Sequence, residues 1–289
     1  MTRVLWEVRG ARLHMPRDLH IAYACGRMAI ATAAHIAPLF YGSPTTARVG
    51  CARLLKLGLL RTFPRDDLTK PAWYSLASAA VEWVAEQMEC EPAELRTVSG
   101  IQRVNKAAVD LRNSLWSSSV TAARATGGRV GLVRARPEWE LRRMSVGVPV
   151  VPDLQLVFAD RAAQPEPQHV WLLELDATSE RTAVIAAKAS AYVALRDGGS
   201  LYGAESWRVL FVTPTLRRAR TVAAAVAGAG AGAFTYVAVG SDLLEGCALS
   251  FVLFRAADLA NSTAARPSSS LVGDAVGGAE GRSATPISG

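Results

Sequence analysis

The sequence has few of the residues that build metal sites and disulfide frameworks. Its 289 residues include four cysteines, and none of these forms a Cys-x-x-Cys pair or another zinc spacing. No two of the histidines have the one-residue spacing of a metal site built on paired histidines; they lie at His14, His20, His35 and His169. We therefore expect the cysteines to be small buried hydrophobic residues in a reducing cytoplasm.

A clear membrane segment is also missing. The first residues contain no uninterrupted apolar run of the kind that a secretory signal needs. Residues 221–241 are uncharged and long enough to span a bilayer. They are mostly alanine and glycine, however, and the run Gly228–Ala233 would interrupt a helix. We expect a helix end, a turn and a buried strand here, in a cytoplasmic protein without membrane contact.

Positive charge is concentrated at the N-terminal end of the chain. The whole chain carries a net charge of +7, and residues 1–72 alone account for it with eleven basic and four acidic residues. Such a basic module on a neutral remainder predicts a polyanionic partner, most simply nucleic acid; the alternative is a surface that only keeps the protein in solution.

Residues 1–76 read as three helices followed by a hairpin. The first helix, in PRDLHIAYAC, has Pro16 near its start and is expected to end at Gly26. The second, TAAHIAPLFYG, is capped by Thr32, and the third, SPTTARVGCARLLKLG, lies between Ser43 and Gly58. Two short strands, LLRTF and WYSLA, follow around a polar tip. This order predicts a winged helix-turn-helix domain.

The third helix suits the major groove of duplex DNA, which is about 12 Å wide. Its three-to-four spacing predicts an inward face of Val49, Ala52, Leu55 and, less strictly, Leu59. The candidate DNA-binding residues of this helix and of the wing are Thr45, Thr46, Arg48, Arg53, Lys56, Arg61, Arg65 and Lys70. The predicted partner is double-stranded DNA, and the alternative is a winged helix used for protein contacts or for a homodimer.

Residues 77–100 are expected to form a connecting helix and a linker, and residues 101–258 a second domain. A long helix is predicted from Ile101, with an apolar stripe that includes Leu111 and Leu115. Strands are predicted at EWELRR, VPDLQLVFA, HVWLLELDA, WRVLFVT, FTYVAVG and ALSFVLF, with helices around Arg181–Arg196 and from Thr215. The order favours an α/β domain. Residues 259–289 are rich in Ser, Gly, Ala and Pro and are expected to be a disordered tail.

Three carboxylates are expected to meet on this domain. Strand alternation puts Glu174 and Asp176 on one face. In the preceding strand Asp153 alternates with Val151, Gln155 and Val157. If these strands are neighbours, the carboxylates are close enough to need a cation between them, for which Mg²⁺ or Mn²⁺ is suited. Lys188 shares a helical stripe with Tyr192 and is expected to be partly buried.

A purely structural interpretation of the same residues stays open. Asp176, Thr178 or Ser179 could cap the following helix, and Lys188 could form a partly buried ion pair with Glu174.

The Pro152-Asp153 pair, followed about twenty residues later by Glu174, resembles the motif of the PD-(D/E)XK nuclease fold. The resemblance implies acids that hold a divalent metal at the scissile phosphate and a lysine that assists the reaction. Asp176 stands where that lysine is normally found, so Lys188 from the next helix would have to supply the ammonium group.

Over residues 16–240 the chain is similar to the replication-relaxation family. The similarity rests on RLLKLGLLRTF, NKAAVDLRNSL, VPDLQLVF and, above all, LLELDATSE followed by Lys188 and Tyr192. It implies a role in plasmid or mobile-element replication and DNA relaxation, with plasmid replication or transfer proteins as further partners. The implied catalytic candidates are Asp153, Glu174, Asp176, Lys188 and Tyr192, with the three acids as metal ligands.

The sequence leaves open a role in replication and relaxation, with or without DNA cleavage, and a purely regulatory role. The second domain is either a Mg²⁺-dependent endonuclease or nickase, or a restriction-endonuclease-like scaffold that binds at an origin without cleaving. The alternative is a non-catalytic winged-helix regulator of transcription or copy number.

Overall fold

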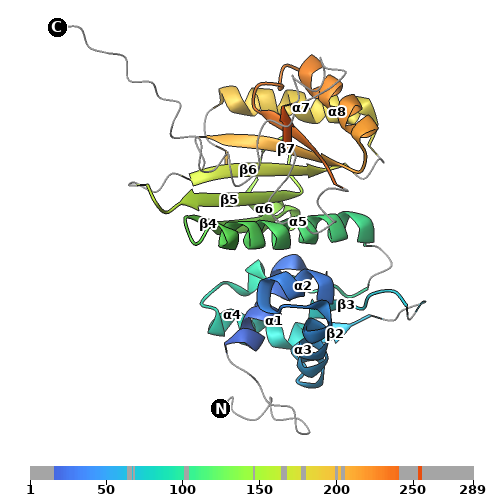
Figure 1. Cartoon of the computed structure of the whole chain (residues 1–289), viewed down its shortest axis with the longest axis vertical. Helices are drawn as coiled ribbons and strands as arrows, with labels where there is room; N and C mark the ends of the chain where they lie inside the picture. The colour runs from blue at the N-terminus through green and yellow to red at the C-terminus, as the bar shows by residue number, and fades with distance from the viewer. Residues whose placement is uncertain are drawn as a thin grey trace, which may run out of the picture. The chain divides into compact units, whose positions relative to one another are not determined.

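The computed structural model describes residues 16–63, 67, 69–100, 104–145, 147–163, 168–176, 180–198, 201–202, 206–240 and 253–255. The chain divides into two compact units, and the division falls between Ser117 and Ser118, inside helix α5 (Lys106–Ala125). Each unit combines helices with a β-sheet, so the predicted α/β class is confirmed (Figure 1). The predicted tail lies outside the described residues.

The first unit contains the three predicted helices and the predicted pair of strands. Its three-stranded antiparallel sheet has the order β1-β3-β2. The elements are α1 (Arg17–Met28), β1 (Ala31–Thr32), α2 (Ala33–Phe40), α3 (Pro44–Lys56), β2 (Leu60–Thr62), β3 (Trp73–Leu76) and α4 (Val81–Gln87), with short 3-10 turns at Ser78–Ala80 and Pro92–Glu94.

Local signals set the helix ends. The Ser43 hydroxyl accepts a hydrogen bond from the Thr46 amide at 3.2 Å, and Pro44 occupies the first helical position of α3. Gly58 follows the helix with a φ of 72°, which a residue with a Cβ adopts only with strain. The predicted stop of α1 at Gly26 is wrong, because the helix continues to Met28. Gly26 is needed for packing instead, since a Cβ there would lie 2.9 Å from a Leu95 methyl carbon.

The predicted inward face of α3 is wrong at Val49 and Ala52, whereas Leu55 is half-buried and Leu59, just after the helix, is buried as predicted. The buried residues of the helix are Ala47, Gly50, Cys51 and Leu54, whereas Val49 is 66% exposed and Ala52 is exposed as well. Two apolar stripes satisfy the three-to-four spacing in this sequence. The structure buries the stripe with the smaller side chains, because Gly50 lets the Tyr41 hydroxyl approach closely at the end of α2.

The N-terminal half of α5 belongs to the first unit and is held there by polar side chains. The Asn113 amide donates to the Ile30 carbonyl at 2.6 Å, and the Ser117 hydroxyl donates to the His35 carbonyl at 2.8 Å. The helix begins at Lys106, and Ile101, where it was predicted to begin, lies outside the described residues. Hydrogen bonds to backbone carbonyls of Ile30 and of helix α2, rather than an apolar stripe alone, therefore hold this part of α5 in the first unit.

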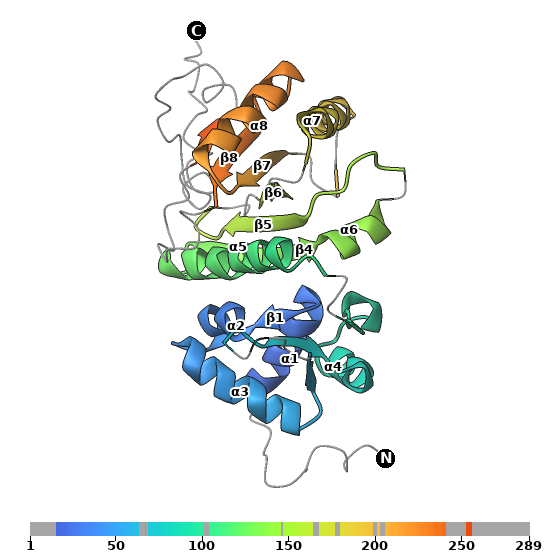
Figure 2. The ribbon, with the colours of Figure 1, turned by 90° about the vertical axis from the view of Figure 1, so that its right-hand side faces the viewer.

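The second unit is built on a six-stranded sheet of order β4-β5-β6-β7-β8-β9. Strands β4, β5 and β6 are antiparallel neighbours, β6, β7 and β8 run parallel, and β9 is antiparallel to β8. Helices α7 and α8 connect the parallel strands and lie on the same face of the sheet (Figure 2). The bounds are β4 (Val130–Pro137), α6 (Glu138–Met144), β5 (Leu154–Asp160), β6 (Gln168–Leu175), α7 (Thr182–Asp197), β7 (Trp207–Thr213), α8 (Leu216–Gly228), β8 (Thr235–Val239) and β9 (Leu253–Arg255).

The strand predicted at EWELRR is in fact helix α6, and the first strand of this unit is β4 instead. Acidic residues lie in the first turn of α6 and arginines in its last turn, which complements the helix dipole. Arg142 pairs with Glu138 one turn away, and Arg136 pairs with Glu140 at 3.3 Å. The first pair lies within α6, and the second ties the end of β4 to the start of the helix; together with the charges at the helix ends they favour a helix over the strand-like alternation of the sequence.

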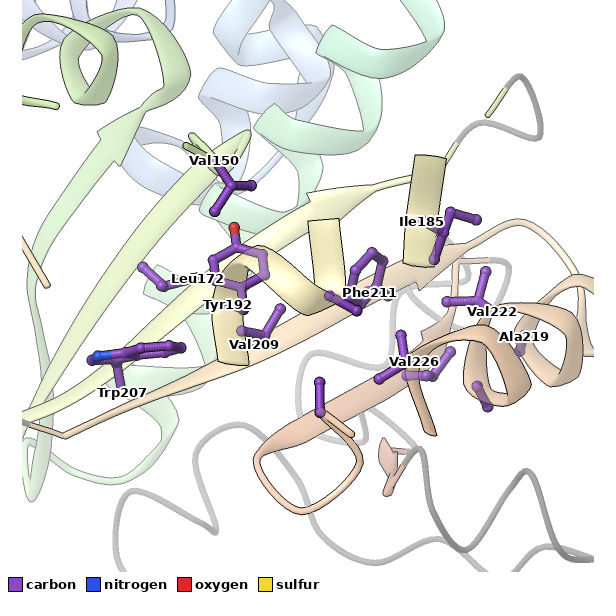
Figure 3. Packing of buried hydrophobic residues seen from close by; sticks show 14 of the residues in the cluster. Val150, Leu172, Ile185, Tyr192, Trp207, Val209, Phe211, Ala219, Val222 and Val226 are labelled. Atoms are coloured by element: carbon purple, nitrogen blue, oxygen red, sulfur yellow. The ribbon is translucent and has the colours of Figure 1, made fainter. Parts of the chain in front are cut away.

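The core of the second unit lies between the sheet and the two helices. Figure 3 shows Leu172, Val209 and Phe211 of the sheet packed under Tyr192 of α7 and Val222 of α8. This packing fixes which residues of β6 point toward α7 and α8, because neighbours along a strand alternate between the two faces. Glu174, two residues after Leu172, therefore points toward the helices.

Residues 221–240 of the uncharged stretch are part of this folded unit. They contain the end of α8, a turn with Gly230 at a φ of 81°, and β8. Across the described residues, no helix is both long and apolar enough to cross a bilayer. The predicted helix end, turn and buried strand are confirmed.

Candidate functional site

Helix α3 presents a continuous exposed face, formed by Thr45, Arg48, Val49, Ala52 and Lys56. These residues recur at three- and four-residue spacing, so they lie on one side of the helix, opposite the buried Ala47, Gly50, Cys51 and Leu54. We call this set the α3 face. Figure 2 shows α3 at the margin of the first unit.

The α3 face is basic, and the sequence around the helix lacks acidic residues. Between Asp18 and Asp66 the sequence contains no aspartate or glutamate. Asp18 itself is fully buried, where it binds Arg53, so it adds no exposed negative charge beside the helix. The positive charges of Arg48 and Lys56 on this face are therefore not offset by an acid on the same helix.

Arg53, predicted to contact DNA, is engaged inside the unit. Its guanidinium group forms two hydrogen bonds with the Asp18 carboxylate, one of them 3.3 Å long, and so ties α3 to α1. Thr46 is part of the helix cap, with its hydroxyl 3.0 Å from that of Ser43. The geometry thus gives Arg53 and Thr46 structural roles in the first unit.

The residues predicted on the wing have mixed placements. Arg61 in β2 donates to the Ser99 carbonyl at 3.3 Å and lies over the Phe63 ring. Lys70 is exposed, with its ammonium 3.9 Å from an Asp67 oxygen. Arg65 lies outside the described residues.

The second unit brings Asp153 and Glu174 together. Strands β5 and β6 are neighbours, with Leu154 opposite Leu173, so Asp153 just before β5 lies beside Glu174 of β6. The backbone amide of Asp153 donates to the Leu173 carbonyl at 2.9 Å, and its carboxylate accepts the Leu175 amide at 2.7 Å. From the sequence we expect these two acids to meet if their strands are neighbours, and β5 and β6 are neighbours.

Glu174 is the centre of a hydrogen-bonded network. It is 1% exposed, and its oxygens accept from the Lys188 ammonium at 2.8 Å and from the Tyr192 hydroxyl at 2.6 Å. Lys188 also contacts the Glu180 carboxylate at 2.7 Å. The ion pair between Lys188 and Glu174 is therefore present. We call Asp153, Glu174, Glu180, Lys188 and Tyr192 the carboxylate cluster.

Burial dominates the acid–base properties of the cluster. It raises the pKa of Glu174 to about 7; Lys188 opposes this shift and Asp153 adds to it. Burial likewise raises the pKa of Asp153, against the Leu175 amide and Lys188. Burial alone would lower the pKa of Lys188, but Glu174 and Glu180 raise it further than burial lowers it. Burial, together with Glu174, raises the pKa of Tyr192 well above its ordinary value.

These shifts assign the protons of the cluster. Lys188 and Tyr192 stay protonated at neutral pH, so both act as hydrogen-bond donors to Glu174. The pKa of Glu174, about 7, lies near neutral pH, so this carboxyl changes its protonation in that range. Tyr192 is fully buried, which suits a residue that positions Glu174 rather than one that attacks a phosphate.

Asp176 is held by a different partner. Arg218, in the first turn of α8, forms two hydrogen bonds with its carboxylate and one with the Glu180 carbonyl. The N-cap of α7 is Arg181, so Asp176 does not cap that helix; Thr178 and Ser179 lie outside the described residues.

Sequence reasoning missed both Arg218 and Glu180. Glu180 is the last residue of the LLELDATSE motif, so its place in the motif could have indicated that it belongs to the site. No sequence motif marks Arg218, because it lies about forty residues after Asp176, in the first turn of helix α8, whose N-cap is Thr215.

The cluster offers a divalent cation two adjacent carboxylates, Asp153 and Glu174. Each oxygen of Glu174 already accepts one hydrogen bond, from Lys188 or from Tyr192, so a cation would have to share this carboxylate with both donors. Among the described residues, no group of three or more His, Cys, Asp or Glu side chains is placed to hold a metal ion. Asp153 and Glu174 could supply two carboxylate ligands of the kind that Mg²⁺ or Mn²⁺ prefers. The metal site of three acids, with Asp176 as the third ligand, stays a prediction.

Comparison with known proteins places the chain in a family. No curated protein and no solved structure gave a match. The replication-relaxation family matches residues 25–205, which is more than half of the chain and includes both α3 and the carboxylate cluster. The predicted family resemblance is confirmed, and the chain belongs to the replication-relaxation family.

Proposed function

We propose that this protein binds double-stranded DNA in plasmid or mobile-element replication and DNA relaxation, and that its first unit is a winged helix-turn-helix domain. The α3 face is the observation that carries the proposal. It joins two basic residues, a threonine and two small or branched apolar residues on the exposed side of one helix. Family membership supports a role in replication or relaxation.

The dimensions and charges suit a major groove. A helix with its side chains is about 10–12 Å across, close to the width of about 12 Å of the groove in B-DNA. Arg48 near the start of α3 can reach base edges, and Lys56 at its end can reach phosphates. Arg61 and Lys70 extend the basic surface along the strand pair, where phosphate contacts are expected.

The test compares two double variants of the full-length protein in a mobility-shift titration with duplex DNA. Arg48→Ala with Lys56→Ala removes the charges of the α3 face and should weaken binding strongly. Lys106→Ala with Arg124→Ala removes one lysine and one arginine that are exposed on α5, and should leave the affinity within about twofold. Equal affinities of the two double variants would contradict the proposal.

Phosphodiester cleavage is a second candidate function, favoured by one observation. Asp153 and Glu174 are side by side, and the Lys188 ammonium contacts Glu174 at 2.8 Å. In this proposal the two acids hold a divalent metal, which would supply Lewis-acid chemistry at the phosphate, and Lys188 stabilises negative charge. The alternative is that the same cluster only stabilises a scaffold.

Supercoiled plasmid incubated with Mg²⁺ or Mn²⁺ separates these alternatives. If the cluster is catalytic, Asp153→Asn should abolish nicking and leave DNA binding by the first unit unchanged. Absence of nicking by the wild type with either metal would leave the scaffold or the non-catalytic regulator as the function of the second unit.

A further inference from the structure

Val49 is exposed in a place where an apolar side chain has no structural role. It is 66% exposed, more than the other large hydrophobic residues exposed in the described part of the chain: Val133, Met144, Val184 and Leu216. It lies in the middle of the α3 face, with Arg48 beside it and Thr45 and Ala52 one turn away on either side. Burial in the fold therefore does not explain the residue.

The neighbours of Val49 narrow what it can contact. A second copy of the chain docking through this face about a twofold axis near Val49 would bring Arg48 close to its own copy, and like charges repel. A polyanion that also offers an apolar group meets both requirements. In the major groove of DNA that group is the 5-methyl group of thymine, which lies beside base edges and phosphates.

We propose that Val49 is a specificity-determining residue that packs on the methyl group of a thymine in the major groove. The inference rests on the proposed DNA-binding function and adds the substrate class: B-form DNA with a thymine at a defined position. Duplex RNA is excluded as the preferred ligand, because its major groove is deep and narrow and its uracil lacks the methyl group.

The experiment replaces thymine methyl groups one at a time. A short duplex is selected from a random pool by the full-length protein, and each thymine is replaced in turn by deoxyuridine, which removes only the methyl group. One buried methyl group contributes about 0.8 kcal/mol, so we expect about fourfold weaker binding at one or two positions. In Val49→Ala the same replacements should change the affinity less than twofold.

Two further variants make the result specific to Val49. Val49→Thr keeps one methyl group and should retain part of the deoxyuridine effect. Val184→Ala makes the same substitution at an exposed valine of α7, and this variant should retain the full deoxyuridine effect. The low burial of Val49 predicts unchanged thermal unfolding of its variants, which circular dichroism checks.

The outcomes separate this inference from the function on which it rests. Failure to bind any duplex DNA contradicts the proposed function. Three other results overturn the role of Val49 while DNA binding stands: binding that no deoxyuridine replacement weakens, a deoxyuridine effect that is unchanged in Val49→Ala, or equal affinity for duplex RNA of the same sequence.

Discussion

Glu174→Gln should change how the stability of the protein depends on pH. Burial raises the pKa of Glu174 from 4.5 to about 7, so the folded state holds this proton more tightly than the unfolded state. A carboxyl group of this kind favours folding most below pH 4.5, and its contribution is lost as pH rises through about 7. Glutamine keeps the shape of the side chain but does not titrate.

The magnitude follows from the two pKa values. A difference between 4.5 and about 7 corresponds to about 3 kcal/mol, of which about 2.5 kcal/mol is lost between about pH 5 and pH 8. Burial also raises the pKa of Asp153, but Asp153 is present in both proteins and largely cancels in their difference. The free energy of unfolding of the wild type, minus that of the variant, should therefore fall by about 2.5 kcal/mol across this range.

Urea unfolding in metal-free buffer, followed by tryptophan fluorescence, measures this difference. Trp171 and Trp207 are buried in the second unit and report its unfolding. Glu82→Gln, at an exposed position of α4, is the matched control and should differ from the wild type by less than about 0.5 kcal/mol at both pH values. A Glu174→Gln difference that is independent of pH, or that grows with pH, would refute the reasoning, because it would mean that Lys188 keeps Glu174 ionised throughout.

Three further changes test packing and ion pairs by urea or thermal unfolding. Gly50→Ala should destabilise the protein by about 1–3 kcal/mol, because the new Cβ would lie 2.0 Å from the Tyr41 hydroxyl oxygen. Gly228→Ala, in the last position of α8 with nothing within 4 Å, should be neutral or slightly stabilising. Arg53→Ala should cost about 3 kcal/mol, since it removes the guanidinium group that forms an ion pair with the buried Asp18. Arg48→Ala on the α3 face should stay within about 0.5 kcal/mol. Arg218→Ala should likewise destabilise through the buried Asp176, and Arg217→Ala, one exposed residue earlier, should not; similar melting temperatures for the two would contradict the assigned ion pair.

Signals within a few residues of each other predicted most of the helices and strands correctly. Ser43, Pro44 and Gly58 delimit α3 because their effects on the backbone act locally. The rotation of α3 could not be predicted in the same way. Val49 and Leu54 lie on opposite sides of the helix, and only the fit of Gly50 against Tyr41 decides which side is buried.

The candidate sites show the same division between local and tertiary information. Alternation along β6 predicted that Glu174 and Asp176 share one face of the strand, and the helical stripe predicted that Lys188 is partly buried. The partner of Asp176 could not be predicted, because Arg218 reaches it only through the crossover of α8 onto the sheet. The role of Arg53 was missed for a similar reason, since nothing near it in the sequence marks Asp18 as its buried partner.

The salt dependence of DNA binding tests the central claim, that the α3 face binds duplex DNA, most directly. Affinities of the full-length protein and of the Arg48→Ala, Lys56→Ala double variant are measured over a range of salt concentrations on the same duplex. Each lost phosphate contact lowers the log–log slope by about 0.9. The loss of the Lys56 contact should therefore make the slope of the double variant smaller by about 0.9, and by up to about 1.8 where Arg48 also contacts a phosphate. The matched Lys106→Ala, Arg124→Ala variant should keep the wild-type slope. Slopes that are equal in all three proteins would contradict the claim, because the charges of the α3 face would then make no contact with DNA.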